Sequence, residues 1–334
     1  MVAVESYAAA VVMCVVTMLC WGSWANTQKL ASREWRFQLF YWDYSVGVLL
    51  LTLVFSLTLG SLGAAGRAFF ADLGQASGSA LLSAFLGGVV FNLANILLVA
   101  AIDIAGMAVA FPIGIGIALV QGTIVNYVGD PKGDPLLIFL GVACVAVAIV
   151  VNALAYRRLP SQGQRTTGKG IAISVAAGIL MGFFFRFVAA AIAKKYGAGE
   201  DVGRLTPYTA LVAFAVGLFA SNFLWNTLVM RFPFTGEPVP LCDYFTKGNA
   251  RLHLVGILGG MIWSVGMSFS ILAGDKAGFA IGYGLGQGAT MVAALWGVFV
   301  WKEFRAAPAG TGGLLAGMFL AYVVGLALIV AGGV

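Results

Sequence analysis

Ten long apolar runs, separated by charged residues or by Pro and Gly, constrain most strongly what this chain can fold into. Each is longer than the roughly 20 residues that a membrane-spanning helix needs, and none shows the strict alternation of a membrane strand. With 61% hydrophobic and 10% charged residues, the chain is too apolar for a soluble domain. We therefore predict an all-α integral membrane protein with ten transmembrane helices. The runs are 6–27, 37–60, 79–101, 105–128, 135–156, 169–193, 205–230, 252–273, 277–300 and 310–332.

The basic residues stand singly or in pairs at the ends of the runs, which is a topology signal and not a nucleic-acid-binding pattern. The loops after even-numbered runs hold six Lys and Arg, and those after odd-numbered runs hold twelve. The positive-inside rule puts the richer loops in the cytoplasm and both termini outside. We expect a multi-pass protein of a bacterial inner (plasma) membrane. The twelve are Lys29, Arg33, Arg36, Arg157, Arg158, Arg165, Lys169, Arg231, Lys247, Arg251, Lys302 and Arg305.

Residues that would support enzyme chemistry are sparse. His253 is the only histidine, and the four cysteines show no CxxC spacing. P-loop, G-x-S-x-G and H-E-x-x-H patterns do not occur in the sequence, and these are the motifs that carry phosphate binding, acyl transfer and zinc chemistry. We expect no enzymatic activity, no metal and no cofactor.

A segment of the first half of the chain recurs 172 residues later without a gap. AAIDIAGMAVAFPIGIG, which begins at residue 100, aligns with LAGDKAGFAIGYGLGQG, which begins at residue 272. Five apolar runs separate the two copies, and five is odd, so the second copy enters the membrane upside down. This predicts a five-plus-five inverted-topology repeat, as found in secondary transporters. The two repeats are residues 1–164 and 165–334.

The repeated turn carries an aspartate in each copy, Asp103 and Asp275. Each falls just before the small residues that begin the next run, where an aspartate can accept backbone N–H groups as an N-cap. Pro112 frees the carbonyl of Ala108 and weakens its helix there. We treat these three residues as candidates for a hinge or gate, and a static kink at Pro112 is the alternative.

Polar and aromatic residues inside the runs supply the candidate substrate contacts, because such groups are costly in a membrane unless they face protein, water or ligand. Aromatic faces can stack on a planar heterocycle or a sugar ring, and amides both donate and accept hydrogen bonds. The set suits a small neutral polar molecule. It comprises Trp21, Trp24, Asn26, Gln28, Asn92, Asn95, Trp263, Tyr283 and Gln287.

Two charged residues also lie inside the runs. Arg186 precedes Lys194 by eight residues, which places its Cα about 12 Å inside that end of the helix. At an offset of 160 it aligns with Asn26, so we expect both to face the centre from opposite halves and Arg186 to bind substrate. Asp43 is the candidate for proton coupling, and a satisfied carboxylate at a helix end is the alternative.

Three motifs carry a resemblance to a known family: WGS at 21–23, YWDYSVGVLL at 41–50 and LWGVFVWKEFR at 295–305. They resemble the ureide permease branch of the drug/metabolite transporter superfamily, which is related to bacterial glucose and rhamnose transporters. The resemblance implies a five-plus-five inverted repeat around a central site and proton-coupled uptake of ureides, nucleobases or sugars. One departure is the short connection RRLPSQGQRTTGK, where plant members have a long cytoplasmic segment.

These observations favour a secondary active transporter that imports a small polar metabolite, such as a ureide or nucleobase, by alternating access. A sugar symporter and a passive facilitator or channel are the alternatives. The expected partners are the substrate, a coupling ion (H⁺ rather than Na⁺) and the lipid bilayer, and no nucleic acid. A homodimer through the runs 135–156 and 310–332 is a further expectation.

Overall fold

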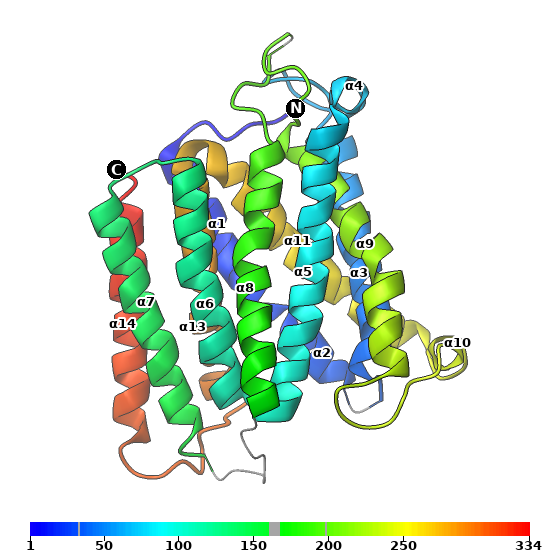
Figure 1. The fold of residues 1–334 in the computed structure, drawn as a ribbon. Coiled ribbons are helices and arrows are strands. Elements are labelled where there is room, and N and C mark those ends of the chain that lie inside the picture. The colour runs from blue at the N-terminus through cyan, green and yellow to red at the C-terminus, as the bar shows by residue number, and fades with distance from the viewer. Residues whose placement is uncertain (33, 160–167, 198) are drawn as a thin grey trace.

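The computed structural model describes residues 1–32, 34–159, 168–197 and 199–334. In this part of the chain ten helices are long and apolar enough to cross a membrane, which confirms the prediction of a multi-pass membrane protein. The expected repeat boundary at 164/165, Arg33 and Arg165 lie outside the described residues. Both termini lie at the same end of the bundle (Figure 1), as an even number of crossings requires.

The first and ninth spans each consist of more than one helix, and the other eight are single helices. The first five spans are α1 with α2 (Tyr7–Ser23, Ala25–Ala31), α3 (Phe37–Leu57), α5 (Gly78–Ala105), α6 (Met107–Gly129) and α7 (Pro135–Tyr156). The second five are α8 (Gly168–Ala191), α9 (Pro207–Arg231), α11 (Ala250–Ala277), α12 and α13 (Phe279–Gly286, Ala289–Leu295) with the π-helical η1 (Trp296–Val300), and α14 (Thr311–Ala331). Two short helices lie in connections, α4 (Phe69–Gln75) and α10 (Cys242–Thr246).

Helices α5 and α11 correspond residue by residue. Each has 28 residues and begins after a side-chain N-cap, Ser77 or Asn249. Each ends at a glycine with positive φ, Gly106 at 78° and Gly278 at 85°, a conformation that favours glycine. The two N-cap residues, Ser77 and Asn249, are 172 residues apart, and so are the two terminal glycines, Gly106 and Gly278. Since five spans separate α5 from α11, the two helices cross the membrane in opposite directions.

Asp103 and Asp275 are not the N-cap residues of the helices that follow them, so the prediction of that position is wrong. Both lie in the last turn of the preceding helix, and Gly106 and Gly278 occupy the N-cap positions of α6 and α12. The reason is the glycine three residues later, Gly106 or Gly278, whose positive φ sets where the helix stops. Pro112 lies inside α6, which continues through it.

Glycines set the closest helix crossings. A Cβ at Gly88 would overlap the backbone of Phe214 on α9, and a Cβ at Gly260 would overlap the backbone of Tyr44 on α3. These two glycines are again 172 residues apart, so equivalent contacts hold α5 on α9 and α11 on α3. Small residues let membrane helices approach closely, and packing rather than hydrophobic burial drives their association.

Helices α7 and α14 form a pair at the edge of the bundle (Figure 1). They approach through Gly141 and Gly325, because a Cβ at either position would overlap the backbone carbonyl of the other. Their outer faces carry exposed apolar side chains such as Leu136 and Leu320. The small-residue faces are thus used within the chain, and only the outer faces remain for lipid or a second copy.

Substitution of Gly88 by Val should destabilise the protein, because the added side chain overlaps the α9 backbone and overpacking costs about 1–3 kcal/mol. Gly317→Val on α14 is the control, since no atom lies within 4 Å of where its Cβ would be. Thermal unfolding of both variants in one detergent measures the difference. Equal midpoints would show that this crossing is not a close contact.

Candidate functional site

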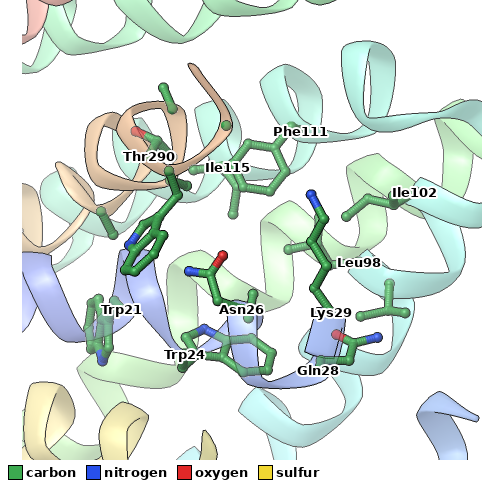
Figure 2. Close-up of a pocket in the computed structure, with 18 of the residues that line it drawn as sticks. Trp21, Trp24, Asn26, Gln28, Lys29, Leu98, Ile102, Phe111, Ile115 and Thr290 are labelled. Atoms are coloured by element: carbon green, nitrogen blue, oxygen red, sulfur yellow. The ribbon is translucent and has the colours of Figure 1, made fainter. Parts of the chain in front are cut away.

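A cavity of about 460 Å³, the central cavity, lies among helices of both halves, chiefly α1, α2, α5, α6, α8 and α13 (Figure 2). Ligand pockets are commonly 300–1,000 Å³, so it is large enough for a small metabolite. Asp103 also lines it. Most of the predicted contact residues line this cavity: Trp21, Trp24, Asn26, Gln28, Asn95, Trp263 and Gln287.

Two spans are interrupted beside the central cavity. The first span breaks at Trp24, between α1 and α2, and the ninth breaks at Gln287 and Gly288, between α12 and α13. Neither α2 nor α13 begins with a side-chain cap. The backbone keeps a right-handed helical conformation at Trp24, Gln287 and Gly288, so each interruption is a local change in helix geometry beside the cavity.

An aromatic wall, formed by Trp21, Trp24, Phe91 and Trp263, covers one side of the cavity. The rings of Trp21 and Trp263 stack with centroids 5.9 Å apart, and Trp21 Nε1 donates to the backbone oxygen of Trp263 at 3.2 Å. Phe91 packs 4.3 Å from Trp263, and Trp24 packs 4.9 Å from Tyr44. These contacts fix the ring planes, so the wall is preorganised for a flat ligand.

Three amides keep hydrogen-bonding capacity toward the cavity. The side chains of Gln28 and Gln287 make no hydrogen bond to any residue that the structure describes, although Gln287 is only 7% exposed. Asn95 donates to the hydroxyl of Tyr41 at 3.2 Å, and its oxygen remains available. A buried amide without a partner costs free energy, so a ligand that satisfies these groups gains affinity.

The mouth of the cavity is bridged by charged and aromatic side chains from both halves. Lys29 Nζ lies 2.7 Å from Glu303 Oε1 and 4.3 Å from the ring centroid of Trp301. Tyr156 donates to the other carboxylate oxygen of Glu303 at 2.8 Å, and Trp301 Nε1 donates to Asn26 Oδ1 at 2.6 Å. The Lys29–Glu303 pair is neutral overall and ties α2 to the end of the ninth span.

Two predicted contact residues are structural. Asn92 donates to Ser221 Oγ at 2.9 Å and to a backbone carbonyl of α9 at 3.2 Å, so it joins α5 to α9. Tyr283 donates to the backbone oxygen of Met181 at 3.1 Å and packs 5.3 Å from the ring of Phe185. Neither side chain lines the central cavity.

Arg186 lies elsewhere, and it does not face Asn26 across the centre. It lines a second cavity together with Asp275, and its guanidinium packs against Gly129 at the end of α6. The position of Arg186 along α8 explains this placement. Phe184, two residues earlier on α8, lines the central cavity, whereas Arg186 lines the second cavity. The spacing between Arg186 and Lys194 predicted the depth of Arg186 in the helix but not the cavity into which it opens.

Asp43 is buried near the start of α3, outside the central cavity, and contacts the only histidine of the sequence. His253 Nδ1 lies 3.0 and 3.1 Å from the two carboxylate oxygens. Tyr244, on α10, donates to Asp43 Oδ1 at 2.5 Å, and burial raises the pKa of Tyr244, so this phenol remains a donor. The contact between this carboxylate and the imidazole joins α3 to α11.

Sequence reasoning missed His253 as the partner of Asp43, and it missed the residues of the mouth. His253 is the only histidine of the sequence, and its pairing with Asp43 depends on the packing of α11 against α3. Lys29 had been counted only as a topology signal. Trp301 and Glu303 belong to the motif LWGVFVWKEFR, which carried the family resemblance and contained the signal.

Comparison with known families supports the resemblance that the motifs suggested. A model of the ureide permease family matches residues 40–166 and 156–332. The chain belongs to the ureide permease family. The two matched ranges overlap at 156–166, in the connection between α7 and α8.

Relatives in the ureide permease family match nearly the whole chain. Ureide permease 1 and Ureide permease 2 of Arabidopsis thaliana are each 24% identical to it, over 98% of both chains. Probable ureide permease A3 of Vigna unguiculata is 23% identical over 83% of this chain and 91% of its own. The alignment with Ureide permease 1 spans 384 positions, more than the 334 residues here, so that relative carries additional residues. These relatives are named permeases, not enzymes.

One solved crystal structure shares the fold of this ureide permease family member. It has a TM-score of 0.61 and 15% sequence identity, and the match covers 97% of this chain and 96% of the other. At this identity the similarity supports the fold and nothing finer.

Replacement of Asn92 by Leu should lower the free energy of unfolding by about 1–3 kcal/mol, because it leaves the buried Ser221 hydroxyl with one partner fewer. Gln287→Leu should change stability much less, since the Gln287 side chain makes no hydrogen bond to any described residue. Thermal unfolding of the two purified variants tests this contrast. The site geometry is wrong if Gln287→Leu is the more damaging substitution.

Proposed function

We propose that this protein is a secondary active transporter that imports a ureide or nucleobase by alternating access. The observation that carries the proposal is the central cavity, which is lined by an aromatic wall and by three amides, Gln28, Asn95 and Gln287. Membership of the ureide permease family supports transport, and the relatives' names refer to ureides. We also propose that the chain belongs to the wider drug/metabolite transporter superfamily.

The chemistry of the cavity favours a planar neutral substrate. Stacking on Trp24 and Trp263 recognises a flat ring, while amides such as Gln28 and Gln287 match a molecule that alternates carbonyl oxygens with N–H groups. Ureides and nucleobases have both properties. A sugar shares the hydrogen-bonding groups and can also stack, so it is the second candidate for the same cavity.

Alternating access is supported by the difference between the two ends of the molecule. The central cavity reaches the surface at the exposed residues Lys29 and Ser32. At the opposite end, the guanidinium of Arg67 binds Asp72 at 2.8 Å and donates to backbone carbonyls of Gly197 and Arg204, which joins the loop after α3 to the loop after α8. We interpret this as an inward-open state, with the α5 and α11 turns as moving parts.

Proton coupling is part of the proposal, with Asp43 as the titrating carboxylate and His253 as its partner. Their hydrogen-bonded contact joins α3 to α11, so protonation changes a link between the two halves. We further propose that the protein lies in a bacterial plasma membrane, with its positively charged loops in the cytoplasm and both termini outside. We also propose a homodimer through the outer faces of α7 and α14.

Ligand binding should increase the free energy of unfolding of the detergent-purified protein by mass action, by about 2.7 kcal/mol at a hundredfold excess over Kd. The thermal unfolding midpoint should rise accordingly. Allantoin, uracil and xanthine should produce a shift, and Gln287→Leu should remove it. Asn92→Leu is the control, since it lowers the midpoint but keeps the shift. If only glucose or rhamnose shifts the midpoint, the sugar symporter replaces this proposal.

Asp43→Asn should abolish uptake driven by an inward proton gradient and leave substrate exchange intact, because exchange needs no net proton movement. Asp243→Asn is the control: its carboxylate is on α10 and pairs at the surface with Lys247 at 2.8 Å. Uptake into proteoliposomes with and without a pH gradient gives the answer. An unchanged pH dependence in Asp43→Asn would remove this residue from the mechanism, and wild-type uptake that never exceeds equilibrium would indicate a passive facilitator.

A further inference from the structure

A second cavity, of about 590 Å³, lies at the end of the bundle that carries both termini. It is formed by the last turns of α6, α8 and α11 and the start of α12. We call it the outer cavity. Three acidic residues line it, Asp130, Asp201 and Asp275, against four basic residues, Lys132, Arg186, Lys194 and Arg204.

Three of the four basic residues already have partners. Lys194 Nζ lies 3.5 Å from Asp130 Oδ1. Lys132 donates to the backbone carbonyl of Asp275, and Arg204 donates to a backbone carbonyl of α8. The charges of these three side chains are therefore engaged within the protein.

Arg186 is the exception among the described residues. Its half-buried guanidinium lies beside Gly129, and it makes no ion pair or hydrogen bond to any described residue. Asp201 does not balance it, because this carboxylate accepts the backbone N–H groups of Lys194 and Lys195 at 2.7 and 3.1 Å. The outer cavity thus presents one unsatisfied, permanently charged set of hydrogen-bond donors.

An aromatic barrier, formed by Phe184, Phe185 and Tyr283, separates the outer cavity from the central cavity. Phe184 lines the central cavity, and its ring lies 6.4 Å from that of Tyr283. Phe185 lies 5.3 Å from Tyr283 and 6.3 Å from Phe279, which lines the outer cavity. The two cavities therefore lie on opposite sides of these three rings.

We infer that the outer cavity is a second binding site, in which Arg186 binds a carbonyl or carboxylate oxygen of the transported molecule before the barrier opens. The inference rests on the proposed function, since it gives the substrate an entry site. A planar guanidinium donates two parallel hydrogen bonds to such oxygens, and Gly129 leaves room for its flat face. Lysine has the charge but not this geometry.

The test uses a variant with its four native cysteines replaced and Ala190→Cys introduced, since Ala190 lines the outer cavity. A membrane-impermeant thiol reagent should label this cysteine, and allantoate or allantoin should slow labelling at least fivefold. Arg186→Gln should remove the protection, and Arg186→Lys should restore it only in part. Lys194→Gln is the matched control, because Lys194 lines the same cavity and is already paired.

Uptake measurements add a second readout. Arg186→Gln should raise KM for uptake roughly tenfold or more, as expected for the loss of a hydrogen bond to a charged group, while Vmax changes little. Full protection in Arg186→Gln would overturn the inference. Protection of wild type by acetate or uracil that depends on Arg186, without uptake of any ureide or nucleobase, would support the site and refute the proposed function. Protection by allantoate alone identifies a carboxylate as the bound group.

Discussion

Close backbone contact at glycines is the constraint on which the rest of the structure depends. Inside a bilayer, apolar side chains gain little by leaving lipid for protein, so helices associate where their backbones can approach. Gly88 and Gly260 provide this contact, each against a helix of the other half: Gly88 against α9 and Gly260 against α3. The crossings bring α5 and α11 around one interior space, and the breaks at Trp24 and Gln287 expose polar groups to it.

The spans could be predicted from the sequence because hydropathy is a local signal, and the similarity of α5 and α11 was visible in the alignment. Hydropathy is a property of each run, and the 172-residue offset needs only pairwise identity. The ends of helices were predicted less well. The sequence predicted Asp103 as the N-cap of the next helix, whereas α5 continues past Asp103 and ends at Gly106, which has a positive φ. The break at Gln287 has no breaking residue other than glycine, in a segment rich in glycine.

The site was predicted in part, and the failures share one cause. Residue type and depth identified Trp24 and Gln287, since polar or amphipathic groups in apolar runs are informative wherever they point. They could not show that Asn92 points to α9 or that Arg186 opens into the outer cavity. The contact of Asp43 with His253 joins residues 210 positions apart, and only tertiary packing reveals such a pair.

That sequence separation has a consequence for the order in which the chain is made. Asp43 enters the membrane with α3, long before the ribosome reaches His253. At about 5–20 residues per second, the delay is roughly 10–40 s. During synthesis the carboxylate of α3 is without its imidazole partner, and an unpaired ionisable group in a membrane segment is costly. The first half of the protein therefore cannot reach its final arrangement before the second half is made, and biogenesis proceeds as one assembly of both halves.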